Sequence, residues 1–123
     1  MKNLAGYRFI INWLPVIIYC SIIFYLSSGP VPQEIPTYPN IDKLLHIVEY
    51  AILGILFTRA IYNHKFRSKK KLFILSILLT TLYGISDEFH QYFVPYRTSD
   101  IIDVFADISG GIIGSLIYIW RKL

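Results

Sequence analysis

The sequence contains only one cysteine, no internal repeat, no low-complexity tract and no polar linker. Cys20 therefore cannot form a disulfide within the chain, and we interpret it as a small apolar side chain. The absence of repeats and linkers excludes repeat arrays and favours one domain over residues 1–123. Hydrophobic residues make up 54% of the chain, which exceeds what the core of a soluble domain needs. The composition therefore predicts a membrane protein.

Four apolar stretches have lengths near the roughly 20 residues that span a bilayer. They cover residues 9–26, 44–62, 72–93 and 101–120. The sequence thus predicts an all-α membrane protein, a single-domain bundle of four transmembrane helices. We expect the first stretch to be a retained helix and not a cleaved signal peptide, because it is long and no small-residue cleavage site follows it.

Basic residues gather near both ends of the chain and between the second and third stretches. They are Lys2, Arg8, Arg59, Lys65, Arg67, Lys69, Lys70, Lys71, Arg121 and Lys122. By the positive-inside rule, both termini are expected in the cytoplasm, and the turn near Arg97 on the outer side. The net charge of +4 therefore indicates topology and contact with anionic lipid of the bilayer. We expect no nucleic-acid partner, because no basic groove is combined with aromatic stacking residues.

Polar residues interrupt the last three stretches at helical spacing. They are Asp42, His46, Glu49 and Tyr50, then Asp87, Glu88, His90 and Gln91, and finally Asp100, Asp103 and Asp107. A lone carboxylate in hydrocarbon costs roughly 2.5–3.5 kcal/mol on insertion scales, so such a group requires partners, water or a function. In the third helix, Asp87, His90 and Gln91 share one face and Glu88 points to an adjacent face. Because the helices alternate in direction, we expect all three polar sets to meet at one depth near the outer surface.

Small residues continue the same faces toward the inner side. They are Gly54, Ser76, Thr80, Gly84, Gly110 and Gly114. Small residues let helix backbones approach closely in lipid. The pattern therefore predicts a tight, dry seam in the inner half of the bundle and a polar pocket in the outer half.

Structural roles are open alternatives for several of these residues. Asn40 and Asp42 suit a cap of the second helix, and Asp100 with Asp103 resembles a capping box for the fourth. The deeper carboxylates suit structural ion pairs or hydrogen bonds, with Glu49, Asp87 and Asp107 as acceptors and His46, His90 and Arg97 as partners. Histidines beside carboxylates also suit proton transfer or metal binding.

One ordered set of residues extends over nearly all of the chain after Pro39. The set comprises Asp42, Lys43, His46, Tyr50, Ser86, Asp87, Glu88, Gln91, Pro95, Arg97, Asp103, Gly110 and Gly114. In its residue types and their order, this set resembles the VanZ-like family. The resemblance implies a small multi-pass protein of the bacterial cytoplasmic membrane, in a family named after a member associated with resistance to the glycopeptide teicoplanin. It implies no particular reaction. Two positions depart from the family pattern, since Tyr96 stands where Gly is usual and Asp107 where Asn is usual.

The first functional hypothesis is a pocket that binds or modifies an anionic envelope lipid or a lipid-linked cell-wall precursor. Lys43 and Arg97 would hold its phosphate or carboxylate. The remaining binding residues would be Gln91, Asp42, Asp103, Asp107, Glu49 and Tyr50. If the protein is an enzyme, the proton carriers for hydrolysis or group transfer would be Asp87, Glu88, His46 and His90.

Two further hypotheses stand beside the pocket. In the second hypothesis, the protein is a structural or regulatory module that pairs with another envelope protein. In the third, its carboxylates and histidines form a proton or metal pathway. The sequence specifies neither a cofactor nor a metal.

Overall fold

The computed structural model describes residues 4–29, 41–64, 68–95, 97 and 99–123. Within this part of the chain there are four helices, α1 (Leu4–Ser27), α2 (Ile41–Asn63), α3 (Lys69–Tyr92) and α4 (Ile101–Lys122). All four are long and apolar enough to cross a membrane. The predicted all-helical membrane fold is thereby confirmed. Asn40, Lys65, Arg67 and Tyr96 lie outside the described residues.

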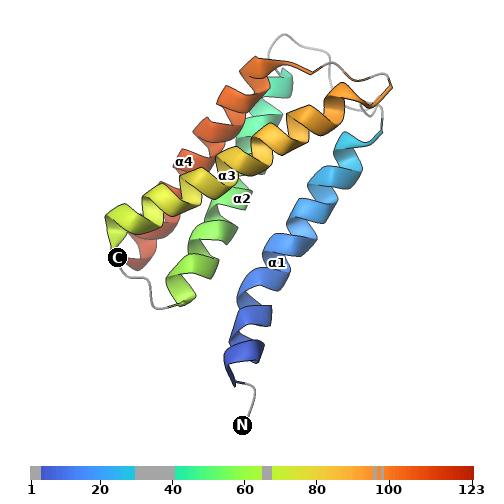
Figure 1. Ribbon diagram of the computed structural model, residues 1–123. Coiled ribbons are helices and arrows are strands. Elements are labelled where there is room, and N and C mark those ends of the chain that lie inside the picture. The colour runs from blue at the N-terminus through green and yellow to red at the C-terminus, as the bar shows by residue number, and fades with distance from the viewer. Residues whose placement is uncertain (1–3, 30–40, 65–67, 96, 98) are drawn as a thin grey trace.

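The helices extend beyond most ends of the predicted apolar stretches, because polar residues continue them at the bundle ends. Ser68 is the N-cap of α3, and its hydroxyl accepts a hydrogen bond from the Lys71 backbone N–H at 3.4 Å. The last turn of α4 carries Arg121 and Lys122, which favour a helix C-terminus electrostatically. Figure 1 places the start of α1 and the end of α4 toward the same end of the bundle.

Helices α2 and α4 pack most closely, along a seam of glycines. A Cβ on Gly54 would lie 2.7 Å from the Gly111 carbonyl oxygen. On the α4 side, a Cβ on Gly110 would collide with the Ile47 carbonyl oxygen, and one on Gly114 with that of Ala51. The two backbones are therefore in contact, and the predicted seam of small residues is confirmed.

Helix α3 covers this pair with small side chains of its own. Thr80 packs against Gly111, where an added Cβ would lie 2.7 Å from the threonine methyl group. The Thr58 hydroxyl donates to the Ser76 hydroxyl at 2.9 Å, and both residues are fully buried. These two hydroxyls are therefore satisfied within the seam.

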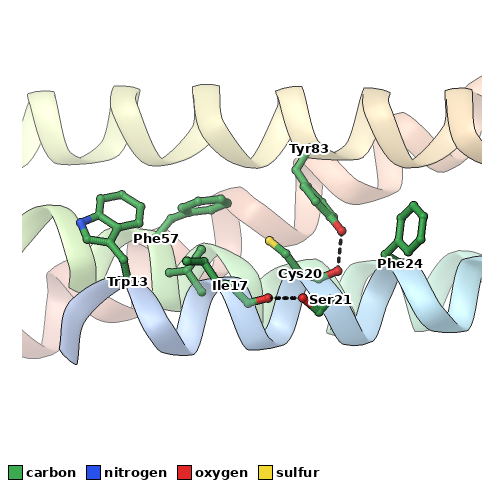
Figure 2. Close-up of a pocket in the computed structure, with 8 residues that line it drawn as sticks. Trp13, Ile17, Cys20, Ser21, Phe24, Phe57 and Tyr83 are labelled. Carbon is green, nitrogen blue, oxygen red and sulfur yellow. Dashed lines mark hydrogen bonds between the residues drawn. The ribbon is translucent and has the colours of Figure 1, made fainter. Parts of the chain in front are cut away.

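Helix α1 lies to one side of the other three (Figure 1). Its carbonyl at Cys20 accepts a hydrogen bond of 2.5 Å from the Tyr83 hydroxyl. Between α1, α2 and α3 lies a groove of about 490 Å³, which Figure 2 shows with Trp13, Phe57 and Tyr83 along it. Cys20 lines the same groove and is half-buried, in keeping with its interpretation as a small apolar side chain.

Candidate functional site

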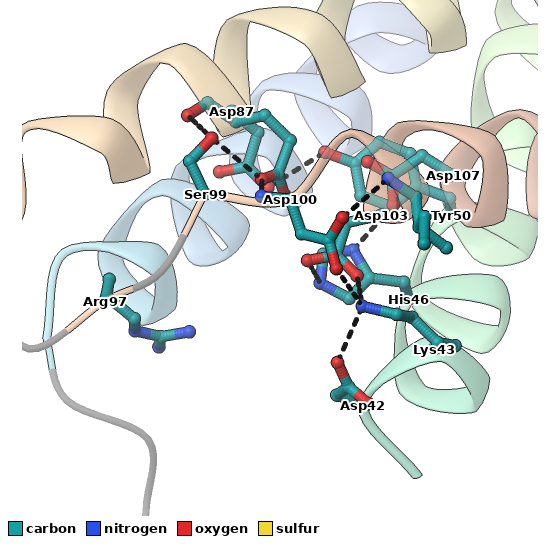
Figure 3. A network of polar contacts seen from close by, with 12 residues as sticks. Asp42, Lys43, His46, Tyr50, Asp87, Arg97, Ser99, Asp100, Asp103 and Asp107 are labelled. Carbon is teal, nitrogen blue, oxygen red and sulfur yellow. Dashed lines mark hydrogen bonds and ion pairs between the residues drawn. The ribbon is translucent and has the colours of Figure 1, made fainter. Parts of the chain in front are cut away.

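Polar side chains from three helices meet where α2 and α4 begin and α3 ends (Figure 3). We call this group the acidic cluster and define it by its residues, Asp42, Lys43, His46, Tyr50, Asp87, Glu88, Asp100, Asp103 and Asp107. It contains six carboxylates. The structure thus brings together residues of the second, third and fourth helices as the spacing predicted.

Lys43 is the main cation of the acidic cluster. Its ammonium lies 2.9 Å from Asp42, 3.0 Å from Asp100 and 2.6 Å from Asp103. Three carboxylates thus surround one ammonium, two of them contributed by the start of α4. Lys43 therefore links α2 to α4, and the geometry gives it acidic partners in place of an open anion site.

His46 forms the second link between α2 and α4. Its Nδ1 lies 2.7 Å from Oδ1 of Asp107, and its Nε2 lies 3.7 Å from Oδ2 of Asp103. Both ring nitrogens therefore face carboxylates. Asp107 is fully buried, so His46 supplies the polar contact that this carboxylate needs inside the bundle.

Tyr50 connects α2 to α3. Its hydroxyl donates to the Asp87 carboxylate at 3.1 Å, and the tyrosine is fully buried. Ser27, the last residue of α1, lies near enough to interact with the Asp87 side chain. Asp87 therefore sits where α1, α2 and α3 meet, beside the ion pairs of α4 and not within them.

Glu88 joins the end of α3 to the start of α4. Its Oε2 accepts hydrogen bonds from the Asp100 backbone N–H at 3.1 Å and from the Ser99 hydroxyl at 3.4 Å. Ser99 was not predicted as a site residue, although a serine directly before a helix N-cap is a usable signal for such a contact.

Asp100 is the N-cap of α4, as predicted. Its carboxylate accepts from the Ile102 backbone N–H at 2.9 Å. That hydrogen bond, and then the contact with Lys43, hold the pKa of Asp100 below its ordinary value. The predicted capping box is wrong in its second half, because the Asp103 carboxylate binds Lys43 and Glu88 takes the Asp100 N–H. Asp42 lies within the first turn of α2 and pairs with Lys43.

Arg97 and His90 lie outside the acidic cluster. The Arg97 guanidinium donates to the carbonyl oxygens of Gly29 and Leu26, each at 2.5 Å, and so caps the C-terminus of α1. His90 stacks on Phe24 with ring centroids 4.3 Å apart, and its Nε2 lies 3.0 Å from the Ser28 hydroxyl. Both residues thus hold α1 against the rest of the bundle.

Glu49 and Gln91 occupy intermediate positions. Glu49 is half-buried on α2, and its backbone carbonyl accepts a 2.9 Å hydrogen bond from Tyr19 of α1. Gln91 is buried in the last turn of α3. In the described part of the chain, no hydrogen bond or ion pair joins the side chain of Glu49 or Gln91 to Lys43 or His46.

Two carboxylate oxygens of the acidic cluster are buried without a hydrogen-bond partner among the described residues, Oε1 of Glu88 and Oδ2 of Asp107. With a ring nitrogen of His46, Glu88 and Asp107 offer one ligand atom each within 4.8 Å of one another. Nitrogen and carboxylate oxygen donors from three helices form a set that suits a metal ion or a proton-transfer site.

Comparison with known proteins places the chain in one family. Neither the curated proteins nor the solved structures contain a match to it. A family model described as VanZ/LLP1 matches residues 3–122, which is nearly the whole chain. This match confirms the resemblance that the polar residues of α2, α3 and α4 predicted. The chain therefore belongs to the VanZ/LLP1 family.

Proposed function

We propose that the acidic cluster binds, and with its proton-carrying groups modifies, the head group of an envelope lipid or lipid-linked cell-wall precursor. Family membership and four membrane-spanning helices support a ligand that is itself in the membrane. The distribution of Lys and Arg supports an orientation with the acidic cluster at the outer leaflet of the bacterial cytoplasmic membrane.

The observation that carries the proposal is the pair of unpartnered oxygens on Glu88 and Asp107. A buried acceptor without a partner costs about 1–3 kcal/mol, and more when it is charged. A network that served only to lock helices together would be expected to satisfy such atoms, since most buried polar groups in proteins are hydrogen-bonded. Their presence favours a site whose remaining partners come from a ligand.

The acidic cluster has the groups that hydrolysis or group transfer requires. His46, between two carboxylates, is suited to accept and return a proton. Glu88, held in place by the start of α4, is suited to orient or deprotonate a nucleophile. Lys43 would fix Asp100 and Asp103 in position, and a head-group phosphate would compete with these carboxylates for it.

A structural or regulatory role is the second candidate, and a specific observation favours it. Lys43 and His46 each bridge α2 to α4, Tyr50 bridges α2 to α3, and Glu88 bridges α3 to α4. A module built on these bridges alone would act by pairing with another envelope protein.

Substitution of buried carboxylates separates the two candidates. We would express the Glu88→Gln and Asp103→Asn variants in a bacterial host and measure membrane abundance, teicoplanin susceptibility and the profile of lipid-linked precursors. Ser109→Ala is the matched control, because this exposed hydroxyl bonds only its own helix at the Phe105 carbonyl. Head-group binding predicts a changed phenotype at normal abundance in both variants. A phenotype that follows abundance, or no phenotype in either variant, would overturn it.

A further inference from the structure

Three side chains of the acidic cluster form a compact set of possible metal ligands. His46 comes from α2, Glu88 from α3 and Asp107 from α4, and their donor atoms lie within 4.8 Å of one another. An ion bonded to nitrogen at 2.0–2.1 Å and to carboxylate oxygen at about 2.0–2.2 Å holds its donors closer together than this upper limit, so the side chains would have to move slightly inward. A small adjustment of side chains would therefore bring all three atoms into a coordination sphere.

The two unpartnered carboxylate oxygens are a second, independent observation that favours cation binding. Glu88 is 5% exposed and Asp107 is 0% exposed, and each has one buried oxygen without a hydrogen-bond donor among the described residues. The Asp107 carboxylate packs directly on Gly84 of α3, where an added Cβ would lie 2.9 Å from its Oδ2. A cation bound by both carboxylates satisfies this region without requiring a new donor from the protein.

The charge around the three side chains also favours a cation. Asp42, Asp100 and Asp103 share the ammonium of Lys43, so that ion pair retains an excess of negative charge. Arg97, the other cationic residue predicted for this site, donates to backbone carbonyls of α1. Asp107 thus has His46 as its partner, and Glu88 has, among the described residues, only the neutral donors of Ser99 and Asp100. A divalent ion would balance both carboxylates.

Contacts of His46 match the way proteins orient a metal-binding histidine. Such a histidine commonly presents its second ring nitrogen to a carboxylate, which fixes the ring and raises its basicity. In this protein Nδ1 faces Asp107, whereas Nε2 lies 3.7 Å from Asp103. Asp103 is in turn held by Lys43 at 2.6 Å. Lys43 thus fixes Asp103, and Asp103 fixes the His46 ring, so that Nδ1 is positioned to bind a metal ion.

We infer that His46, Glu88 and Asp107 bind one divalent transition-metal ion, such as Zn²⁺ or Mn²⁺, between α2, α3 and α4. One imidazole with two carboxylates suits these ions better than a thiolate-preferring metal. Three protein ligands leave at least one coordination position for water or for an oxygen of another molecule. Metal binding does not depend on the proposed head-group function, because the ligands all come from the protein.

The test is metal binding by the full chain purified in detergent. After treatment with a chelator and its removal, the protein would be titrated with ZnCl₂ and separately with MnCl₂, and bound metal measured by mass spectrometry after gel filtration. We expect one ion per chain for the wild type. The His46→Gln and Glu88→Gln variants should each lose at least about 100-fold in affinity. Asp103→Asn, which removes no ligand, should lose about 10–100-fold.

Two controls keep the result interpretable. His64→Gln changes a histidine at the opposite end of α2, where it accepts a hydrogen bond from Trp13, and should bind metal as the wild type does. X-ray absorption of the zinc-loaded wild type should show one imidazole and only nitrogen or oxygen donors. Binding of neither ion by the wild type, or unchanged affinity in both His46→Gln and Glu88→Gln, would overturn the inference. Metal binding with no precursor phenotype would reject the head-group function alone.

Discussion

Helix α1 and the α2–α3–α4 unit are both apolar enough to cross a membrane but are held in different ways. Within the most apolar 18-residue segment of each helix, 17% of the residues are buried in α1, against 39% in α2, 33% in α3 and 39% in α4. The three-helix unit has backbone contact along glycines and a charged network at one end. Helix α1 has an apolar groove and a few hydrogen bonds. The difference indicates that the polar and backbone contacts of α2, α3 and α4 set the geometry of the site, and that α1 is attached to them by fewer contacts.

The glycine seam gives the largest expected effect. Replacing Gly114 by Ile would place side-chain atoms where the Ala51 carbonyl lies, so α2 and α4 must separate. We expect a loss of about 3 kcal/mol or more in the free energy of unfolding. The measurement is unfolding of the detergent-solubilised protein followed by circular dichroism. Gly6→Ile in α1 is the control, since nothing lies within 4 Å of a Cβ there. Equal stability of the two variants would contradict the comparison.

Removal of the Lys43 charge should have the second-largest effect. Lys43→Met leaves the buried carboxylate of Asp103 without its 2.6 Å partner. Breaking a buried ion pair on one side costs roughly 3–5 kcal/mol, and we expect about 2 kcal/mol because Lys43 is partly exposed. The same unfolding measurement applies, with the exposed Lys70→Met as control. The double variant Lys43→Met with Asp103→Asn should recover part of the loss, and no recovery would argue against a specific pair.

The attachment of α1 should respond to Arg97 more than to Arg59. Arg97 donates twice to the end of α1 at 2.5 Å, whereas Arg59 donates to the Ile11 carbonyl at 3.4 Å. We expect Arg97→Met to speed amide hydrogen exchange in the last turn of α1 by about tenfold, the equivalent of about 1.4 kcal/mol. Arg59→Met should leave that turn unchanged. Exchange in α2, α3 and α4 serves as the internal reference, and equal acceleration there would show general loosening instead.

The smallest effect concerns pH. The pKa of Asp100 is lowered in the folded protein by the Ile102 N–H and by Lys43, so its contribution to stability is present above the unfolded pKa, near 4. That contribution is lost as pH falls through the lower, folded pKa. Asp100→Asn, which retains a capping side chain, should therefore show a weaker loss of stability than the wild type when thermal unfolding is compared between pH 5 and pH 3. Parallel curves would contradict this assignment.

The four helices and the convergence of their polar faces were predictable from the sequence, because apolar length and helical spacing suffice for both. The neighbouring helix that each polar residue of α3 contacts was not predictable. Successive helix residues turn by about 100°, so Glu88 points away from the face that Asp87 and His90 share. The sequence does not specify that α3 has α1 on one side and α4 on another. Glu88 consequently reaches α4, while His90 packs on Phe24 of α1.

Arg97 shows a second limit of the sequence. A lone arginine in an outer loop, near a helix N-terminus, was reasonably predicted to hold an anion. Its actual partners are the Leu26 and Gly29 carbonyls at the end of α1, which are far away in sequence. Backbone acceptors of this kind have no sequence signature, since every residue carries one. The contact can be found only once the packing of α1 is known.

The contact between the α2 and α4 backbones has a consequence for membranes of different thickness. Helices usually accommodate a thinner or thicker bilayer by tilting relative to their neighbours. His46 and Asp107 are carried by the two helices whose glycines touch, so a change of tilt between these helices is opposed by carbonyl contacts on both sides. Adjustment to the lipid environment is left to α1, and the spacing of the charged groups is insulated from it.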